Sequence, residues 1–317
     1  MELHFMIKRH RRAKLIFNPS AGASRPSPIK IEDVIHEMQA WKLVPEAYLI
    51  EPGCDLPAIV QDALAKGIRM FVVCGGDGTI SAVARTLAGT RATLGIIPTG
   101  TQNNTALSLG IPEDIPTAIA ILRTGRRIKV DVGMATCGKI STPFLEFSSV
   151  GLISTLFPFA DDIQHGNLTA IGDFLKTLAS SPPAKIHLLL DDKQEIHNLG
   201  HVVLVSNMPY IGLHYQVGST ASFKDGLLDV LFFADLSKLD LLGYVFQGVG
   251  EGKPEDARIQ HFQVRRVDID THPAMPVMAD GTALGKGKMR IEVQRRSLAV
   301  MVGPPAPEVL PVPGKTL

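Results

Sequence analysis

The sequence lacks several features that would assign it to a class of protein at once. Its 317 residues contain only 3 cysteines, widely spaced and without a CxxC pair, so neither a disulfide framework nor a cysteine zinc site is indicated. No apolar run approaches the ~20 residues that span a bilayer. No GxxxxGK[ST] motif is present, which excludes a P-loop NTPase, and no HExxH motif indicates a metalloprotease.

An excess of charge of either sign is also lacking. Lys and Arg total 32 against 31 for Asp and Glu, so the protein has no overall field that would attract nucleic acid, and we predict no nucleic-acid partner. The basic run from Lys8 to Arg12 is the one local exception, and it reads either as a solvated arm or as a weak lipid-headgroup contact. We predict a cytoplasmic protein without a transmembrane segment and leave peripheral membrane contact and a homodimer open.

The length of the chain and a change in its pattern of predicted helices and strands indicate two domains. About 150 residues per domain is a common size, and the pattern changes after about Met134. We expect an α/β nucleotide-binding domain over residues 1–134, a β-rich, β-sandwich-like domain over residues 135–303, and an irregular Pro-rich tail over residues 304–317.

The first half alternates apolar runs with amphipathic patterns. We predict strands at residues 13–17, 47–50, 70–73 and 94–97, and helices around residues 31–38, 56–63, 80–87 and 116–122. This alternation is typical of a doubly wound α/β sheet. The second half predicts mostly strands, at residues 144–148, 185–190, 202–205, 228–233, 262–269 and 289–293, with helical patterns at residues 168–178 and 239–246.

The strongest local signal is a glycine-rich turn between a buried strand and an amphipathic helix: Gly75, Gly76, Asp77, Gly78 and Thr79. Open α/β sheets bind ligands at such junctions. Glycines let the backbone approach an anion, and the helix N-terminus favours negative charge, so phosphate is the expected ligand. Asp77 could hold a magnesium ion there, although Gly and Asp also favour turns for conformational reasons alone. A second polar turn follows the next strand, from Gly100 to Asn104, and two adjacent turns suit a polyphosphate.

Several motifs in this order resemble the bacterial diacylglycerol kinase-like lipid kinases, relatives of sphingosine and ceramide kinases. They are residues 18–22 (NPSAG), 75–79 (GGDGT), 100–103 (GTQN), 223–229 (FKDGLLD) and 279–282 (ADGT). The resemblance covers nearly the whole chain and implies ATP, Mg²⁺ and a lipid substrate met at a membrane surface. It implies that ATP is surrounded by Asn18, Gly75, Gly76, Asp77, Gly78, Thr79, Thr101 and Asn103.

The same resemblance assigns roles to four acidic residues. It implies that Asp77 and Asp131 belong to a magnesium–water network and that Asp225 binds a structural magnesium ion. Asp280 would be the general base that takes a proton from the substrate hydroxyl, which is a sensible role for a carboxylate in phosphoryl transfer. Read without the family, Asp225 and Asp280, each followed by Gly, are also compatible with plain tight turns.

The chain departs from the family at two positions. The family usually has an acid where this chain has Asn104, and another where it has Thr282. Neutral ligands weaken the field for a divalent cation, so activity or metal affinity is in question. Two alternatives therefore remain beside a lipid kinase: a non-catalytic protein that binds nucleotide or lipid, and an NAD kinase, which shares the GGDGT turn but would need further motifs that this chain does not supply.

Overall fold

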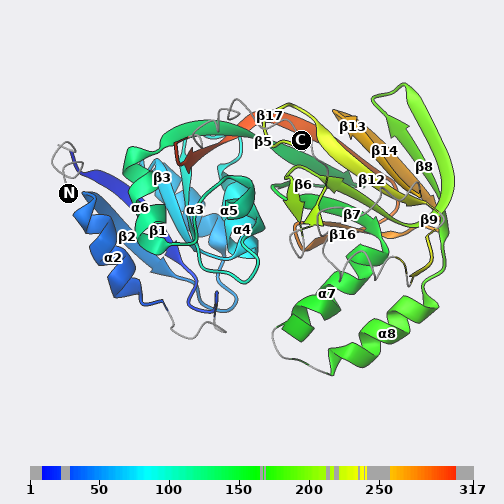
Figure 1. Ribbon diagram of the computed structural model, residues 1–317, viewed down its shortest axis with the longest axis horizontal. Helices are drawn as coiled ribbons and strands as arrows, with labels where there is room; N and C mark the ends of the chain where they lie inside the picture. The colour runs from blue at the N-terminus through cyan, green and yellow to red at the C-terminus, as the bar shows by residue number, and fades with distance from the viewer. Residues whose placement is uncertain are drawn as a thin grey trace, which may run out of the picture.

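The computed structural model describes residues 9–22, 29–164, 167, 169–211, 215–217, 221–234, 236–238, 240 and 258–304. The described chain forms two lobes, with two long strands running from one lobe to the other (Figure 1). These are β5 (Arg126–Cys137) and β17 (Met289–Val302), which pair antiparallel along most of their length. The α/β first lobe and the β-rich second lobe confirm the predicted fold class.

The first lobe is built on a parallel sheet in the order β2–β1–β3–β4. Its elements are β1 (Arg11–Phe17), α2 (Ile31–Ala40), β2 (Leu43–Leu49), α3 (Leu56–Ala65), β3 (Met70–Gly75), α4 (Asp77–Leu87), β4 (Thr93–Pro98), α5 (Asn104–Ser108) and α6 (Ile115–Thr124). Every residue of β3 is buried, as expected for a central parallel strand with helices on both faces.

Amphipathic helices cover the two faces of this sheet. Val34 and Met38 of α2 pack with Ile119 of α6 on one face, whereas Val60 of α3 and Ile80 of α4 pack on the other. All five side chains are fully buried, and burying an aliphatic side chain of this size stabilises the fold by about 1.5–3 kcal/mol. The two polar turns lie at the carboxyl ends of neighbouring parallel strands, the first after β3 and the second after β4.

The second lobe is a β-sandwich flanked by a helical pair. Its elements after β5 are β6 (Ile140–Phe144), β7 (Phe147–Gly151), α7 (Leu152–Gln164), α8 (Ala170–Ser180), β8 (Ala184–Leu190), β9 (Gln194–Ser206), β10 (Tyr210–Ile211), β11 (Tyr215–Gln216), β12 (Leu228–Ala234), β13 (Ile259–Val264), β14 (Arg266–His272), β15 (Pro276–Ala279) and β16 (Thr282–Lys286). One layer runs β6–β5–β17–β14–β8–β9, and the other runs β16–β15–β7–β9–β12–β13.

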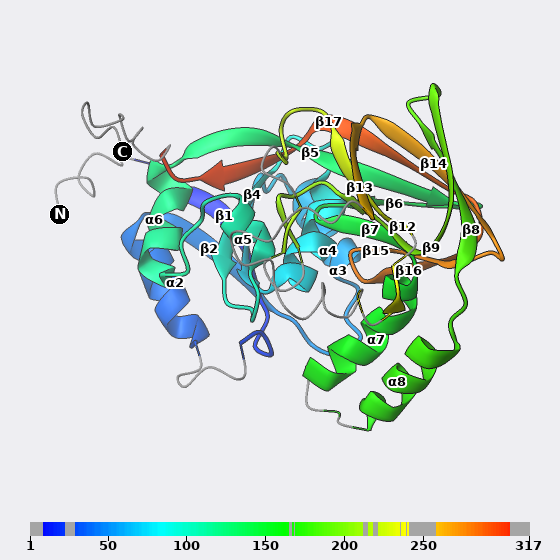
Figure 2. The ribbon, with the colours of Figure 1, turned by 45° about the vertical axis from the view of Figure 1, so that its right-hand side comes forward.

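Strand β9 belongs to both layers of the sandwich. Its first half pairs with β8, and its second half, beyond Gly200, pairs with β7 and β12. Helices α7 and α8 pack on the outer side of the second layer, where Leu156 is buried and Phe159 is partly buried against it. These two side chains therefore help to fill a core. Figure 2 shows both helices on the side of the second lobe opposite β14 and β17.

Strand β17 returns the chain to the first lobe. Ala299 and Val300 pair in parallel with Thr93 and Leu94 of β4, so the end of the described chain extends the first sheet. A division of the chain at Met134 therefore does not separate the two lobes completely, because residues 298–302 come from the far side of that boundary. The division itself stays a prediction.

Three sequence-based expectations need correction. The strand predicted over residues 144–148 is two strands, β6 and β7, separated by Leu145 and Glu146. The strand predicted over residues 262–269 is also two, β13 and β14, because Arg265 marks the point where the chain changes layer. Arg11 and Arg12 lie within β1 and not before it. Lys8, the Pro-rich tail beyond Pro304, and nearly all of the helix predicted over residues 239–246 lie outside the described residues.

Candidate active site

Three loops meet at the carboxyl-end edge of the first sheet. The N–H of Asn18, directly after β1, donates to Cys74 O of β3 at 2.9 Å, and the N–H of Thr99, after β4, donates to Gly75 O at 3.1 Å. The Asn18 side chain also donates from Nδ2 to Thr79 Oγ1 at 2.9 Å. Because parallel strands end at the same edge, the residues predicted from separate motifs come together as expected.

Two glycines bring the turns into backbone contact. A Cβ on Gly100 would lie 2.5 Å from Gly76 Cα, a separation that no side chain tolerates. A Cβ on Gly78, in contrast, would meet nothing within 4 Å, so the first turn of α4 faces open space. Gly76 precedes α4, and no side chain caps the start of that helix. This arrangement of glycines beside a helix N-terminus suits a phosphate group.

Asp77 joins the two turns. Its carboxylate accepts hydrogen bonds from the N–H groups of Asn104 and Thr105, both at 3.0 Å. These are the first two residues of α5, so the carboxylate lies at the positive end of that helix. Each Asp77 oxygen keeps a further lone pair, and the magnesium role stays a prediction.

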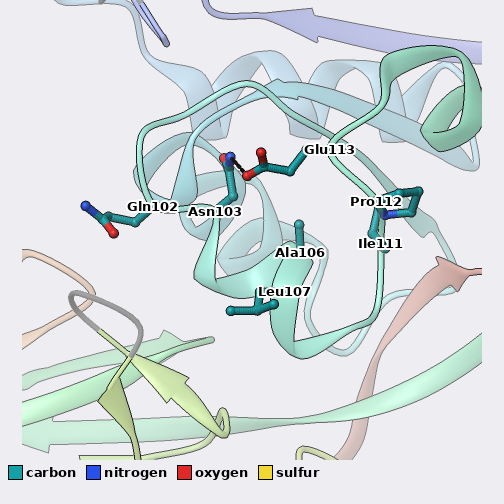
Figure 3. Close-up of a pocket in the computed structure, with 7 residues that line it drawn as sticks. All are labelled: Gln102, Asn103, Ala106, Leu107, Ile111, Pro112 and Glu113. Atoms are coloured by element: carbon teal, nitrogen blue, oxygen red, sulfur yellow. Dashed lines mark hydrogen bonds between the residues drawn. The ribbon is translucent and has the colours of Figure 1, made fainter. Parts of the chain in front are cut away.

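Asn103 is held in the left-handed region, with φ of 53°. Its Nδ2 donates to Gly100 O at 3.1 Å. The same atom donates to Glu113 Oε1 at 2.8 Å (Figure 3). The residue borders a hollow of about 240 Å³ formed by Gln102, Asn103, Ala106, Leu107, Ile111, Pro112 and Glu113. That volume is below the ~300 Å³ of typical ligand pockets. Asn103 thus shapes the second turn, while Thr101 is exposed at its tip.

Asp280 comes to this region from the second lobe. It lies in the turn between β15 and β16 with φ of 39°, and its carboxylate accepts hydrogen bonds from the backbone N–H groups of Leu145 at 2.6 Å, Glu146 at 3.1 Å and Phe147 at 3.0 Å. Burial raises the pKa of Asp280, although these hydrogen bonds and the neighbouring Ser81 and Arg85 act in the opposite direction. The same three hydrogen bonds interrupt the strand that the sequence predicts over residues 144–148.

Glu146 is a functional candidate that the sequence did not reveal. Only 7% of the residue is exposed, and its Oε1 lies 3.3 Å from the Thr105 hydroxyl. Burial, followed by the negative charges of Asp77 and Asp280, raises the pKa of Glu146 well above its ordinary value. Three carboxylates, one from the first lobe and two from the second, therefore influence one another at the junction of the lobes.

Asp131 and Asp225 form a separate acidic group. The buried Asp131 carboxylate accepts hydrogen bonds from Gly226 N at 2.7 Å and Arg296 N at 2.6 Å. Asp225 is exposed as a residue and accepts from Leu227 N at 2.9 Å. Its carboxyl is nevertheless partly desolvated, and this, with smaller contributions from Asp229 and Asp131, raises its pKa against the lowering effect of the hydrogen bond from Leu227. Asp131 thus ties β5 to the loop before β12 and to Arg296 of β17, within the irregularity of the β5–β17 pairing between Gln294 and Leu298, and both predicted metal roles stay predictions.

Family comparison covers both lobes. Residues 12–135 match the diacylglycerol kinase catalytic domain, and residues 160–302 match the YegS C-terminal NAD kinase beta sandwich-like domain. A diacylglycerol kinase of Staphylococcus saprophyticus is 32% identical over 288 residues, which are 87% of this chain and 90% of that protein. The chain belongs to the bacterial diacylglycerol kinase-like lipid kinase family.

Other members of this lipid kinase family align with the chain over different shares of their own length. A probable YegS-like lipid kinase of Pseudomonas aeruginosa is 29% identical, covering 78% of this chain and 80% of that protein. An uncharacterized protein of Synechocystis and the diacylglycerol kinase of Staphylococcus carnosus match over 55% and 52% of their own lengths, so the chain spans about half of those two relatives.

Solved structures share the fold. A putative diacylglycerol kinase from Bacillus anthracis has a TM-score of 0.74 at 22% identity, covering 94% of this chain and 100% of that one. An NAD kinase from Archaeoglobus fulgidus, solved in complex with ATP, has a TM-score of 0.53 at 11% identity, covering 92% and 93%. Among the described residues, none of the helices combines the length and the hydropathy that a transmembrane span requires.

Proposed function

We propose that this protein transfers the γ-phosphoryl group of ATP to a hydroxyl group of a diacylglycerol-like lipid. The observation that supports this best is the meeting of carboxylates from both lobes, Asp77 beside the glycine-rich turns and Glu146 with Asp280 opposite them. Membership of a lipid kinase family supports this reaction class, and the positions of these side chains suit a phosphate donor on one side and an alcohol acceptor on the other.

The nucleotide would lie at the edge where the turns of the first lobe meet. Gly76 and Gly100 hold the two turns together, and Gly78 leaves the start of α4 accessible to phosphate oxygens. Asn18, fixed by its bond to Thr79, borders the same edge. Most catalysis of phosphoryl transfer comes from such positioning and from neutralising charge.

The donor atoms around Asp77 fit a hard divalent cation. Asp77, Glu146 and Asp280 supply carboxylate oxygens and Thr105 a hydroxyl, which are the ligand types that Mg²⁺ prefers. Bound Mg²⁺ would neutralise phosphate charge. We propose that Asp77 and Glu146 would hold it, so that Glu146 supplies the negative charge that Asn104 and Thr282 do not.

Asp280 is the proposed proton acceptor. As the lipid oxygen forms its bond to the γ-phosphorus, the bond to the leaving oxygen of ADP breaks and the hydroxyl proton passes to the Asp280 carboxylate. Burial brings its pKa closer to the working pH of a base, while the N–H groups of residues 145–147 fix its orientation. The backbone of the same segment thus positions both Asp280 and Glu146.

A non-catalytic binding role is the second candidate. It is favoured by one observation: both oxygens of Asp280 already accept backbone hydrogen bonds, which lowers the basicity of the carboxylate. A protein of this kind would bind ATP without turnover.

The test of the proposed function is a transfer assay with γ-labelled ATP across diacylglycerols, ceramide, sphingoid bases, phosphatidylglycerol and NAD. We expect a labelled lipid product that requires Mg²⁺. Ligand-dependent thermal stabilisation by ATP without any labelled product would support the binding role instead. Labelled NADP would indicate an NAD kinase.

A further inference from the structure

A cluster of nitrogen and oxygen ligands lies on the β8–β9 hairpin, at the outer end of the second lobe (Figure 1). His187 of β8 and His197 of β9 are cross-strand partners, and their rings stack with centroids 4.1 Å apart. Glu195, two residues before His197, lies on the same face of β9 because side chains alternate along a strand. The sequence separates these residues by a turn, so their proximity follows only from the pairing register.

The three side chains approach one another closely. Glu195 Oε2 lies 3.2 Å from His197 Nε2 and 3.6 Å from His187 Nε2, and one ligand atom from each residue lies within 4.8 Å of the others. His187 Nε2 is covered and makes no hydrogen bond to any described residue, because 3.6 Å is too long for one. A buried ring nitrogen left in this state is costly unless a further partner satisfies it.

We propose that His187, Glu195 and His197 bind a transition-metal ion of the Zn²⁺ type. Two imidazoles and a carboxylate form a ligand set that suits zinc, with water completing the coordination. Ligands at 2.0–2.2 Å from a tetrahedral ion lie roughly 3.3 Å from one another. The two separations that involve Glu195 already fall near this value.

One side chain must move to complete the site. The two rings are stacked nearly parallel, with an interplanar angle of 5°, so their lone pairs do not yet converge on one point. His197 is 65% exposed, and rotation of its ring meets solvent. His187 is less exposed and keeps its place between β9 and β14, where its cross-strand neighbour Asp270 is bound to Lys288 Nζ at 3.0 Å. His187 therefore serves as the fixed ligand.

The location of this cluster indicates a structural and not a catalytic role. The hairpin lies away from the first lobe in both views (Figures 1 and 2). A bound ion would join β8 to the first half of β9, the strand whose second half reaches the other layer of the sandwich. Because the ion would bind the folded protein and not the unfolded chain, it would raise the free energy of unfolding, whether or not the enzyme is active.

The test is a Zn²⁺ titration of metal-free protein by calorimetry, in excess Mg²⁺ so that the oxygen-only site at the lobe junction is occupied. We expect one Zn²⁺ per chain, at least tenfold weaker binding in His197→Ala and Glu195→Gln, and X-ray absorption that reports two imidazole nitrogens. Zn²⁺ should also raise the Tm of the native protein but not that of His197→Ala.

His36→Ala is the matched control, because it removes an exposed histidine on α2 and should leave Zn²⁺ binding unchanged. Circular dichroism melting without metal checks that each variant is folded, and Glu195→Gln retains the shape of the native side chain. The proposal is overturned if His197→Ala and Glu195→Gln bind Zn²⁺ as the native protein does, if His36→Ala weakens binding equally, or if the native protein takes up no Zn²⁺.

Discussion

Arg85 of α4 donates a hydrogen bond of 2.6 Å to the hydroxyl of Thr282, two residues after Asp280. This contact joins the first lobe to the β15–β16 turn of the second. Burial is the main influence on the pKa of Asp280 and raises it, whereas the positive charge of Arg85 is one of the influences that lower it. The residue at position 282 can therefore alter the proposed base through Arg85.

Thr282→Glu should move the acid limb of the pH–activity profile to higher pH. The new carboxylate would pair with Arg85 and offset the positive charge that lowers the pKa of Asp280, so the base would need a higher pH to lose its proton. The measurement is kcat/KM against pH for Thr282→Glu beside Thr282→Gln, which adds length without charge. Superimposable profiles would show that Arg85 does not act on the reacting carboxylate.

Glu146→Gln should stabilise the protein at neutral and higher pH while lowering its activity. Because burial and the charges of Asp77 and Asp280 raise its pKa in the folded state, native Glu146 contributes stability at low pH that is lost as pH rises through the raised pKa. Without Mg²⁺, the variant should have a higher Tm than the native protein at pH 8, where native Glu146 carries the energetic cost of a buried charge. Below about pH 4 the two should match, since the carboxyl is then protonated in the folded and the unfolded state alike.

Phosphoryl transfer by Glu146→Gln should fall at least about tenfold, which corresponds to ~1.4 kcal/mol of transition-state stabilisation. Glu32→Gln, at an exposed position on α2, is the control and should change neither quantity. A variant of Glu146 that is less stable than the native protein at pH 8 would contradict the account of this buried carboxylate.

Asp280→Asn should abolish transfer and also lower stability. From the motif alone we would predict little change in Tm, but the structure shows three backbone N–H groups that bind the carboxylate. The new amide NH₂ cannot accept from them, and a buried unsatisfied donor costs about 1–3 kcal/mol. ATP affinity, measured by calorimetry, should remain because the turns around Gly76 and Gly100 belong to the first lobe. Loss of ATP binding equal to the loss of turnover would remove Asp280 from the role of base.

Most elements of the first lobe could be predicted because the residues that define each one are close together in the sequence. The apolar stripe of α2 and the continuous run of β3 follow from spacing alone, and Gly75 to Thr79 mark their turn by composition. The Glu146 site could not be predicted this way. The strand is interrupted at Leu145 because the backbone N–H of Leu145 donates to Asp280, which lies 135 residues later in the sequence. The pattern of residues 144–148 alone contains no sign of that contact and predicts one unbroken strand.

The sequence pattern does not predict the return of β17 to the first sheet, for a similar reason. The sequence pattern assigns residues 298–302 to the predicted second domain, residues 135–303, and only their pairing with β4 and β5 places them in the first lobe. Asp131 shows the limit of motif transfer, because its backbone partners Gly226 and Arg296 are distant in sequence and reveal a structural contact that the motif does not suggest.

Gly78→Ala should separate ligand binding from folding. Its Cβ would meet no protein atom, and alanine is favoured over glycine in a helix by about 0.5–1 kcal/mol, so Tm should stay the same or rise. ATP affinity should fall because the methyl group enters the space assigned to phosphate. Gly100→Ala should lower both Tm and affinity, since its Cβ clashes with Gly76. Native ATP affinity in Gly78→Ala would place the phosphates elsewhere.

Transfer from γ-labelled ATP to diacylglycerol in vesicles tests the central claim most directly, with native protein, Glu146→Gln, Asp280→Asn and the exposed control Asp62→Asn compared side by side. The account predicts a labelled phospholipid from the native protein and from Asp62→Asn that disappears when Mg²⁺ is chelated, at least about tenfold slower labelling by Glu146→Gln, and none or nearly none by Asp280→Asn. Labelled product from Glu146→Gln and Asp280→Asn at the native rate, or no product from native protein that binds ATP, would contradict it.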